Sequence, residues 1–203
     1  QADLALALCL QAQQIIRPDL KILIMSATLD GEKLSALLGN APIITSIGKQ
    51  YPITHRYIPA EANTPLPLQM ARLIKKAFLD NTSGDILAFF PGTGEINKAL
   101  SLLAEENLPA MLMPLYGDLP FHKQQEAIMP HPQGMRKIIL STSIAETSLT
   151  IEGITIVVDS GYARVPRFDP RSGLTRLETV RITKDAADQR AGRAGRLSAG
   201  ICY

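Results

Sequence analysis

One short segment near the C-terminal end combines a glutamine with several regularly spaced arginines. It reads Gln-Arg-Ala-Gly-Arg-Ala-Gly-Arg over residues 189–196. On a helix, Gln189, Arg193 and Arg196 would project within about 60° of one another, because a helix advances about 100° per residue. Guanidinium groups stabilise the charge on a transferring phosphoryl group, and an amide beside them can orient an attacking water. The spacing therefore predicts a phosphoryl-transfer site, with salt-bridged structural arginines as the alternative.

Hydroxyl side chains form two further candidates. Residues 141–150 read Ser-Thr-Ser-Ile-Ala-Glu-Thr-Ser-Leu-Thr and follow an apolar, strand-like run. Hydroxyl and backbone N–H groups in such a place can bind phosphate, whereas turns closed by Ser and Thr side chains are the alternative. Ser26 and Thr28 lie between a predicted strand and a predicted helix, where with Asp30 they can also serve as an N-cap.

Glycine-containing turns offer backbone amides to a phosphate at two more places. The sequence Gly92-Thr-Gly-Glu lacks the frame and the lysine of a phosphate-binding P-loop, so that interpretation is rejected. Gly92 and Thr93 still follow a predicted strand and precede a predicted helix, where N–H and O–H donors can meet a nucleic-acid phosphate. Gly117 allows a similar approach of the backbone, although the carboxylate of Asp118 would repel a phosphate.

Composition and charge narrow the class of protein. The 203 residues are 46% hydrophobic and contain no long polar tract, which excludes collagen, coiled coils and disorder. Residues 1–163 carry 12 basic and 15 acidic side chains, whereas residues 164–203 carry 9 and 4. Arginine-rich charge of this kind favours a polyphosphate or nucleic-acid ligand, and a solvated basic face is the alternative. The apolar runs are too short to span a membrane, and Cys9 and Cys202 are read as reduced thiols of a cytoplasmic protein.

The predicted elements alternate between strand and helix, which indicates an α/β fold with a doubly wound sheet. A proline-rich interruption places a domain boundary near residues 48–52, giving domains 1–50 and 51–203. In the first we expect helices over residues 3–16 and 32–38 and strands over 21–25 and 43–47. In the second we expect strands near residues 54–58, 86–90, 111–115, 137–141 and 155–158, and helices near 67–79, 94–106, 121–128 and 185–194. Between residues 162 and 183 a turn at 168–173 predicts an inserted β-hairpin that carries Arg167 and Arg171.

Five blocks in this order resemble conserved motifs of superfamily 2 helicases. Residues 26–28 resemble motif III, 86–92 motif IV, 115–120 motif IVa, 141–151 motif V and 189–196 motif VI. Five blocks in the correct order are much more specific than any one of them. The chain resembles the DEAH-box family, in particular its bacterial HrpB-type helicases, along almost its entire length.

The resemblance implies a RecA-like fold, with residues 1–50 as the tail of a first RecA-like domain and 51–203 as the second. It implies Gln189, Arg193 and Arg196 as catalytic residues, and a coupling role for Ser26 and Thr28. Nucleotide contacts are implied for Ser148, Thr150 and Glu152, with Glu152 standing where Asp is commoner. Contacts to nucleic acid are implied for the following residues, with Ser143 standing where Asn is usual: Gly92, Thr93, Gly117, Thr142, Ser143, Arg167 and Arg171. The hairpin resembles the family's strand-separating wedge, and Ile128, in place of an aromatic residue, implies weak stacking on the nucleotide base.

Two motifs of the family are missing from the 203 residues, namely Gly-Lys-Thr and Asp-Glu-Ala-His. In the family these bind the β- and γ-phosphates and Mg²⁺, so the chain alone is expected to hydrolyse no ATP and to hold neither group tightly. In a longer parent chain the implied cofactors are ATP and Mg²⁺. The implied partners are single-stranded nucleic acid, RNA rather than DNA, and the first RecA-like domain, with no membrane. The alternatives are a non-catalytic RecA-like binding module and, remotely, a Rossmann-like metabolite enzyme.

Overall fold

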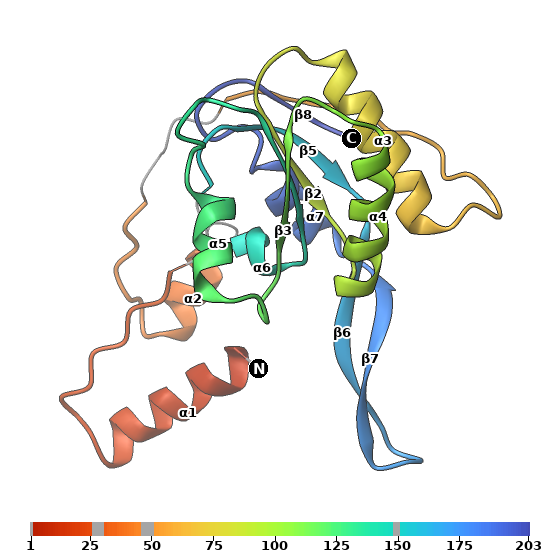
Figure 1. Cartoon of the computed structure of the whole chain (residues 1–203). Coiled ribbons are helices and arrows are strands. Elements are labelled where there is room, and N and C mark those ends of the chain that lie inside the picture. The colour runs from red at the N-terminus through yellow and green to blue at the C-terminus, as the bar shows by residue number, and fades with distance from the viewer. Residues whose placement is uncertain (1, 26–30, 46–50, 148–150) are drawn as a thin grey trace. The chain divides into compact units, whose positions relative to one another are not determined.

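The computed structural model describes residues 2–25, 31–45, 51–147 and 151–203 (Figure 1). The chain divides into two compact units, an N-terminal unit of Gln1–Ser46 and a C-terminal unit of Ile47–Tyr203. The C-terminal unit contains the arginine-rich segment 189–196, the hydroxyl-rich segment 141–150 and the glycine turns at Gly92 and Gly117. That unit therefore carries most of the candidate site.

The N-terminal unit contains two helices, α1 (Ala2–Ile15) and α2 (Gly31–Leu37), within one residue of their predicted bounds. The strands predicted over 21–25 and 43–47 are wrong for the described residues, because 21–25 and 43–45 pair with no neighbouring strand. A strand needs a partner for its backbone N–H and C=O groups, and no described residue of this unit supplies one. Its described side chains include none that is buried, and Leu23 and Ile44 are 79% and 93% exposed.

A six-stranded sheet forms the centre of the C-terminal unit, and every pairing in it is parallel. In the sheet the strands lie in the order β1-β8-β5-β2-β4-β3. They are β1 (Ile53–His55), β2 (Asp85–Phe89), β3 (Met111–Leu115), β4 (Lys137–Ser141), β5 (Ile154–Asp159) and β8 (Gly200–Cys202). All except β8 lie close to predicted strands, so the predicted doubly wound parallel sheet is confirmed.

Helices cover both faces of this sheet because consecutive side chains of a strand point to opposite faces. In β2, Ile86 and Ala88 pack in one core with α3 (Leu66–Asp80) and α4 (Thr93–Glu105). Leu87 and Phe89 pack in the other core, with α5 (Phe121–Ile128), α6 (Ile144–Thr147) and α7 (Lys184–Ala191). Both faces of β2 are therefore buried, which explains its unbroken apolar sequence.

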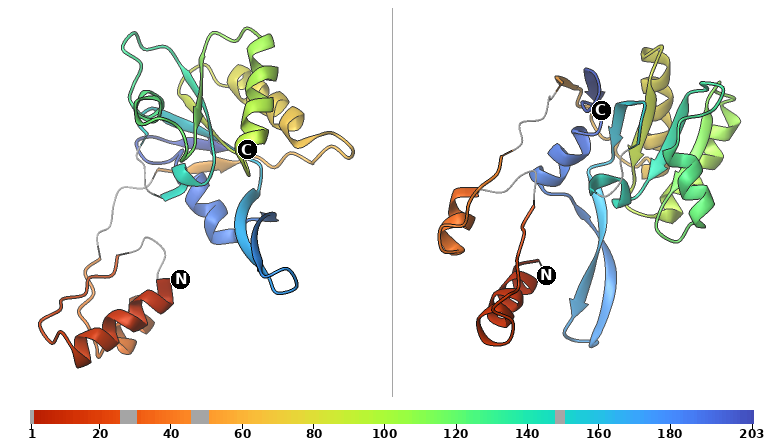
Figure 2. Two further views of the ribbon diagram at one scale, coloured as in Figure 1. Left: turned by 60° about the horizontal axis from the view of Figure 1, so that its bottom comes forward. Right: turned by 90° about the vertical axis from the view of Figure 1, so that its left-hand side faces the viewer.

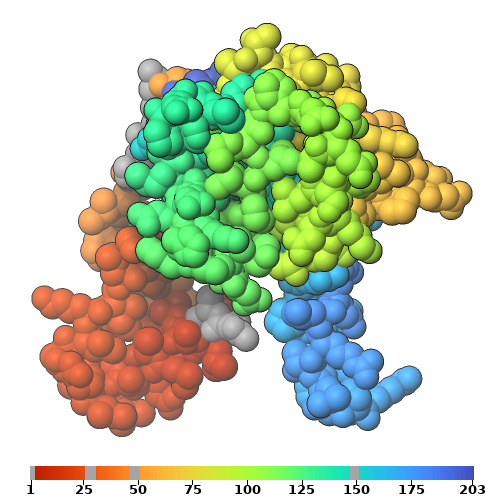
Figure 3. Space-filling view, viewed as in Figure 1, coloured from red at the N-terminus to blue at the C-terminus, as the bar shows by residue number. Residues whose placement is uncertain are grey.

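The predicted hairpin is present as β6 (Tyr162–Asp169) and β7 (Leu174–Arg181), paired antiparallel in a sheet of their own. Both views in Figure 2 show it extending away from the large sheet, and its tip stands clear in the space-filling view of Figure 3. Gly173 closes the turn at a φ of 67°, a left-handed conformation that favours glycine, and its N–H donates to the Asp169 carbonyl. The strands of the hairpin expose most of their side chains on both faces.

The two edges of the large sheet are short or interrupted. At one edge β1 has only three residues, and at the other β3 contains Pro114, which has no backbone N–H. The N–H of Met111 donates to the carbonyl of Arg136 on the β4 side, so the nitrogen of Pro114, three residues on, lies on the outer side of β3. This placement costs the sheet no internal hydrogen bond.

Candidate functional site

Three of the predicted phosphate-binding turns lie at the carboxyl edge of the sheet, which is the side where its parallel strands end. Gly92 and Thr93 follow β2, Gly117 follows β3, and Thr142 and Ser143 follow β4. Because these three strands are parallel and adjacent, their carboxyl ends meet at one edge, where ligands of such sheets commonly bind. Backbone hydrogen bonds join these loops to one another. The N–H of Phe90 donates to the backbone carbonyl of Ser141, and the N–H of Thr142 donates to the backbone carbonyl of Leu115.

Each turn offers a different kind of donor. Gly92 is the N-cap of α4 and has no side chain to cap the helix, so backbone N–H groups of the first turn remain available at this end. After β4, the hydroxyl oxygen of Ser141 is buried 3.0 Å from the carbonyl oxygen of Leu115, which leaves Thr142 and Ser143 nearer the surface. Gly117 lies in an exposed turn. The edge therefore presents amide and hydroxyl groups suited to a phosphodiester backbone.

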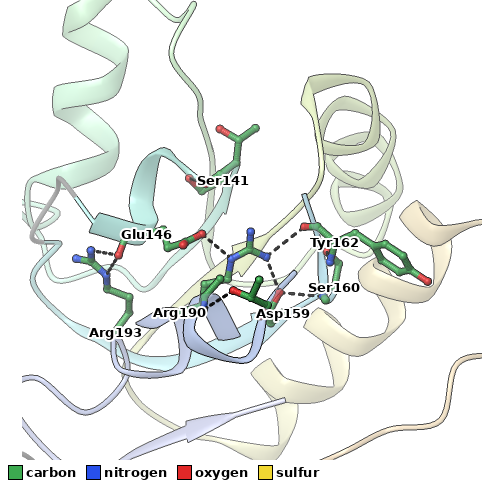
Figure 4. A network of polar contacts seen from close by, with 11 residues as sticks. Ser141, Glu146, Asp159, Ser160, Tyr162, Arg190 and Arg193 are labelled. Carbon is green, nitrogen blue, oxygen red and sulfur yellow. Dashed lines mark hydrogen bonds and ion pairs between the residues drawn. The ribbon is translucent and has the colours of Figure 1, made fainter. Parts of the chain in front are cut away.

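Arg190 lies at the centre of a buried polar network below this edge (Figure 4). Its side chain is 1% exposed and forms ion pairs with Glu146 of α6 at 3.0 Å and with Asp159 of β5 at 2.9 Å. It also donates to the carbonyl of Tyr162 at 3.2 Å, and its guanidinium lies 4.9 Å from the ring centre of Phe89. Such a cation is well paired, so Arg190 ties α6, β5 and the start of the hairpin together.

Arg193 is positioned by the backbone of α6. Helix α7 ends at Ala191, so the predicted helix over 185–194 is too long, and Arg193 and Arg196 lie in turns instead of on one helical stripe with Gln189. Glycines at 192 and 195 disfavour a longer helix. The Nε and Nη2 groups of Arg193 both donate to the carbonyl oxygen of Glu146. Burial and the nearby charge of Arg196 lower the pKa of Arg193 to about 10, partly offset by Glu146.

Arg193 and Arg196 are near neighbours in space. Together with Leu87, Ala145, Ile151 and Ile154 they line one small hollow, and Arg196 is exposed while Arg193 is 5% exposed. Gln189 is half-buried on α7, and Glu152 is exposed in the turn that leads into β5. Two guanidinium groups beside apolar side chains repel each other, so an anion bound between them is favoured because it reduces this repulsion. The structure thus brings Arg193 and Arg196 together, although by turns and not by a helix.

Four predicted site residues lie outside the described residues. They are Ser26 and Thr28 of the predicted coupling motif and Ser148 and Thr150 of the predicted nucleotide contacts. Glu152 is the remaining predicted nucleotide contact, and it precedes β5, at the amino edge of the sheet. The turns after β2, β3 and β4 lie at the carboxyl edge. The predicted nucleotide residue and the predicted nucleic-acid residues therefore lie at opposite edges.

The two predicted hairpin arginines have different surroundings. Arg167 forms an exposed ion pair with Glu178 at 3.0 Å and stands directly opposite Arg176, a like-charged neighbour that weakens the pairing of the strands. Arg171 lies in the turn, where its backbone N–H donates to the Asp169 carboxylate. Hydrogen bonds from Ser172 and from this N–H lower the pKa of Asp169. The tip is therefore a defined turn that carries an exposed cation.

Two buried cations, Arg190 and Lys137, have structural roles that the sequence did not predict. Arg190 was visible as part of the arginine segment, but only its contacts distinguish it from Arg193. The Lys137 side chain is buried in β4, and its Nζ donates to the carbonyls of Ala127 and Met129 at 2.9 and 2.7 Å, which caps the end of α5. Burial lowers the pKa of Lys137, partly offset by Asp85. An isolated lysine in an apolar strand gives no signal that could have predicted this cap.

Residues 2–25, 31–45, 51–147 and 151–203 contain no cluster of three or more His, Cys, Asp or Glu side chains placed to hold a metal ion. Among the helices of the same ranges, none has the length and apolar character needed to cross a membrane.

A parallel six-stranded sheet with helices on both faces, a projecting hairpin and a paired-arginine turn fit a helicase C-terminal domain. Residues 69–198 match the family "Helicase conserved C-terminal domain", and the chain belongs to that family. It is 52% identical over 202 residues to the ATP-dependent RNA helicase HrpB of Escherichia coli, covering 99% of this chain and 25% of that protein. It is 40% identical over 191 residues to the ATP-dependent RNA helicase HrpA of Borreliella burgdorferi, covering 92% and 23%.

Solved structures give the same assignment. The crystal structure of the Escherichia coli DEAH/RHA helicase HrpB matches with a TM-score of 0.90 at 50% identity, covering 99% of this chain and 26% of that one. A second crystal structure, of the DExH-box NTPase HrpB of E. coli, matches with a TM-score of 0.88. The predicted resemblance to HrpB-type DEAH-box helicases and the predicted RecA-like fold are confirmed. The chain spans about a quarter of the length of these relatives.

Proposed function

We propose that this chain is part of an ATP-dependent RNA helicase, in which it supplies arginine fingers and grips the nucleic-acid backbone. Two similar proteins, HrpB of Escherichia coli and HrpA of Borreliella burgdorferi, are named ATP-dependent RNA helicases, which supports ATP dependence and RNA as the substrate. The observation that carries the proposal is the pair Arg193 and Arg196, which line one hollow while Arg193 is held by the α6 backbone. Such a pair is suited to a phosphoryl group that gains charge.

The residues present fit the phosphates of ATP but not its metal ion. Burial and the charge of Arg196 lower the pKa of Arg193, and a polyphosphate beside the two arginines would stabilise their charged forms. No described cluster of carboxylates is available for Mg²⁺, so we assign no residue of this chain to it. When bound, ATP supplies the free energy for movement. Arg193 and Arg196 stabilise charge on its phosphates, and Gln189 orients water.

The nucleotide contacts at the other predicted positions remain part of the proposal. Glu152 is exposed and accessible to a ribose, and Ser148 and Thr150 precede it in the same segment. Ser26 and Thr28 are proposed to couple the nucleotide state to movement between two RecA-like domains. The first of those domains, to which we assign residues 1–50, is the proposed intramolecular partner.

Nucleic acid is proposed to bind at the carboxyl edge. The amides at Gly92 and Thr93, the turn at Gly117 and the hydroxyls of Thr142 and Ser143 face the same edge and suit successive phosphates. Contacts of this type do not read sequence and weaken with salt. Arg167 and Arg171 extend the same interaction along the hairpin.

Helix α6 connects the two parts of the site. It begins two residues after Thr142, its Glu146 carbonyl accepts from Arg193, and its Glu146 carboxylate pairs with Arg190. A shift of the nucleic-acid grip at the start of α6 therefore moves the carbonyl that positions Arg193. This gives a short physical route between backbone binding and phosphate chemistry.

The test is ATP hydrolysis by the full-length protein, with and without single-stranded RNA or DNA. We expect Arg193→Ala and Arg196→Ala each to reduce turnover by about 10³-fold or more, the range for loss of an arginine finger. Arg72→Ala is the matched control, because Arg72 forms an exposed ion pair with Glu61 at 2.8 Å away from the site. Circular dichroism should show that all variants fold.

Unchanged turnover in both variants would contradict the proposed finger role. If the full-length protein binds RNA but hydrolyses no ATP, the non-catalytic RecA-like binding module becomes the better description. Stimulation by DNA equal to that by RNA would overturn the proposed preference, since phosphate contacts alone do not distinguish the two.

A further inference from the structure

We propose that Arg164 is a positioning residue that fastens the base of the hairpin to the loop between β2 and α4, through Glu95. The inference rests on the proposed function, because that loop carries Gly92 and Thr93 of the nucleic-acid grip. Its consequence is that the grip and the hairpin move as one body during strand separation.

The contact between the two segments is specific in geometry. Nη2 of Arg164, the third residue of β6, lies 2.9 Å from Oε1 of Glu95, in the first turn of α4. The two side chains are only 37% and 24% exposed. The ion pair joins the hairpin to α4, and 69 positions in sequence separate its partners.

Gly92 makes room for the guanidinium. A Cβ atom at position 92 would lie 2.4 Å from Nη1 and 2.8 Å from Cζ of Arg164, closer than atoms can approach. The φ of Gly92 is −165°, an extended conformation open to any residue, so the backbone alone does not require glycine here. The space above Gly92 is instead filled by Arg164. An alanine there would displace a flexible side chain, which disturbs the ion pair and not the fold.

Glu95 depends on this partner. Its Oε2 atom is buried and accepts no hydrogen bond from the described part of the chain, so its charge relies on Arg164 and on the N-terminal end of α4. The positive end of a helix repels a cation, and Arg164 lies beside Gly92, the N-cap of α4, so the ion pair with Glu95 offsets this repulsion. Removing either partner therefore loosens the hairpin base.

Because the ion pair lies at the base of the hairpin, a small change there can move the hairpin tip over a larger distance. Each hairpin strand has eight residues, and at about 3.4 Å per residue the tip lies far beyond Arg164. Other bonds hold the base to its own neighbours: Arg190 donates to the Tyr162 carbonyl at 3.2 Å, and the Tyr162 N–H donates to the Ser160 hydroxyl at 3.2 Å. Neither of these bonds reaches α4, so with Arg164 released the hairpin loses its ion pair with that helix, and a movement of the loop before α4 is transmitted less completely to the hairpin tip.

The experiment compares Arg164→Gln, Glu95→Gln and the double variant in the full-length protein. The first readout is hydrogen exchange at the amides of β6 and β7, which requires no activity. The second is the number of base pairs separated per ATP hydrolysed on a partial RNA duplex. Arg72→Gln is the matched control, the same substitution in an ion pair remote from the hairpin.

We expect each single variant to speed exchange across the hairpin by about two- to fivefold, the range for one partly exposed ion pair. Separation per ATP should fall by a similar factor, while ATP hydrolysis without RNA stays unchanged. The double variant should be no worse than either single one, because both remove the same contact. A merely structural role would lower hydrolysis and separation together.

A second double-mutant cycle combines Gly92→Ala with Arg164→Gln and again measures hydrogen exchange in the hairpin. If Gly92 acts by making room for Arg164, Gly92→Ala changes hairpin exchange in the wild-type background but adds little to Arg164→Gln. Unchanged hairpin exchange in both single variants, or fully additive effects in the double one, would overturn the proposal. Absence of ATP hydrolysis or strand separation in the wild type would overturn the proposed function instead, and hydrogen exchange would still decide the role of Arg164.

Discussion

Arg190 and Arg193 are three residues apart and share Glu146 as a partner, yet they use different atoms of it. Arg190 pairs with the carboxylate, and Arg193 donates to the backbone carbonyl. The pairing of Arg190 with Glu146 and Asp159 compensates its buried charge, whereas the pKa of Arg193 is lowered to about 10. Two identical side chains in one motif thus have a structural and a proposed catalytic role.

Replacing Arg190 should destabilise the C-terminal unit strongly. Arg190→Met leaves the carboxylates of Glu146 and Asp159 largely buried without their cation, at a cost of about 3 kcal/mol in the free energy of unfolding. Urea denaturation of the 203-residue chain measures this difference. Arg72→Met, which breaks an exposed pair, should cost under about 1 kcal/mol. Equal effects of the two substitutions would show that the buried network contributes little.

The two cysteines should differ in reactivity. Burial, and to a lesser degree the charge of Asp159, raises the pKa of the Cys202 thiol from 9.0 to about 12, while Cys9 is exposed. At pH 9 the folded protein should therefore be alkylated by iodoacetamide at Cys9 and protected at Cys202, and urea should remove the protection. Between these two pKa values the unfolded thiol loses its proton first, so Cys202 lowers stability as the pH rises. Mass spectrometry of the alkylated peptides checks the order, and rapid labelling of native Cys202 would contradict it.

The hairpin could be predicted from the sequence, but its attachment to α4 through Arg164 and Glu95 could not. The turn residues and the flanking strand-forming segments indicated β6 and β7 directly from the sequence. Arg164 and Glu95 are too far apart in sequence for local patterns to pair them. Strand β8 was missed because three residues give no measurable alternation, and the strands predicted in the N-terminal unit failed because a strand requires a neighbour that sequence periodicity cannot supply.

Charge at the hairpin should govern the salt dependence of RNA binding. Arg167→Gln and Arg171→Gln each remove one proposed phosphate contact, so the slope of log affinity against log salt should decrease in magnitude by about 1 for each substitution. Fluorescence anisotropy of labelled single-stranded RNA at several salt concentrations measures the slope. Lys76→Gln, on α3 and paired with Asp80, is the control that should leave it unchanged. Wild-type slopes in both arginine variants would place the RNA elsewhere.

The two units differ in how much apolar surface they bury. The C-terminal unit buries apolar side chains on both faces of its sheet, whereas the described part of the N-terminal unit buries none. We expect residues 51–203 alone to unfold cooperatively with the thermal midpoint of the full 203 residues. Residues 1–46 alone should show little helix by circular dichroism, because isolated helices of 14 residues are marginal in water. A stable, helical N-terminal peptide would contradict this view.

The 203-residue chain alone is expected to hydrolyse no ATP. Its proposed fingers act on a phosphate that other motifs of the family must hold, and neither of those motifs is among the 203 residues. ATP hydrolysis by the chain alone should equal that of its Arg193→Ala variant. A rate that depends on Arg193 in the isolated chain would show that its own residues suffice.

The proline of β3 has a consequence for the protein during synthesis and storage. An exposed sheet edge invites a strand of another molecule, and repeated additions of this kind lead to aggregates. With its nitrogen on the outer side, Pro114 denies such a strand one of its hydrogen-bond donors, and the opposite edge ends in the three-residue β1. Pro114→Val, which suits a strand and restores the donor, should leave the native fold intact but increase light scattering at high protein concentration. The proline of this edge strand thus opposes extension of the sheet by a strand from another molecule.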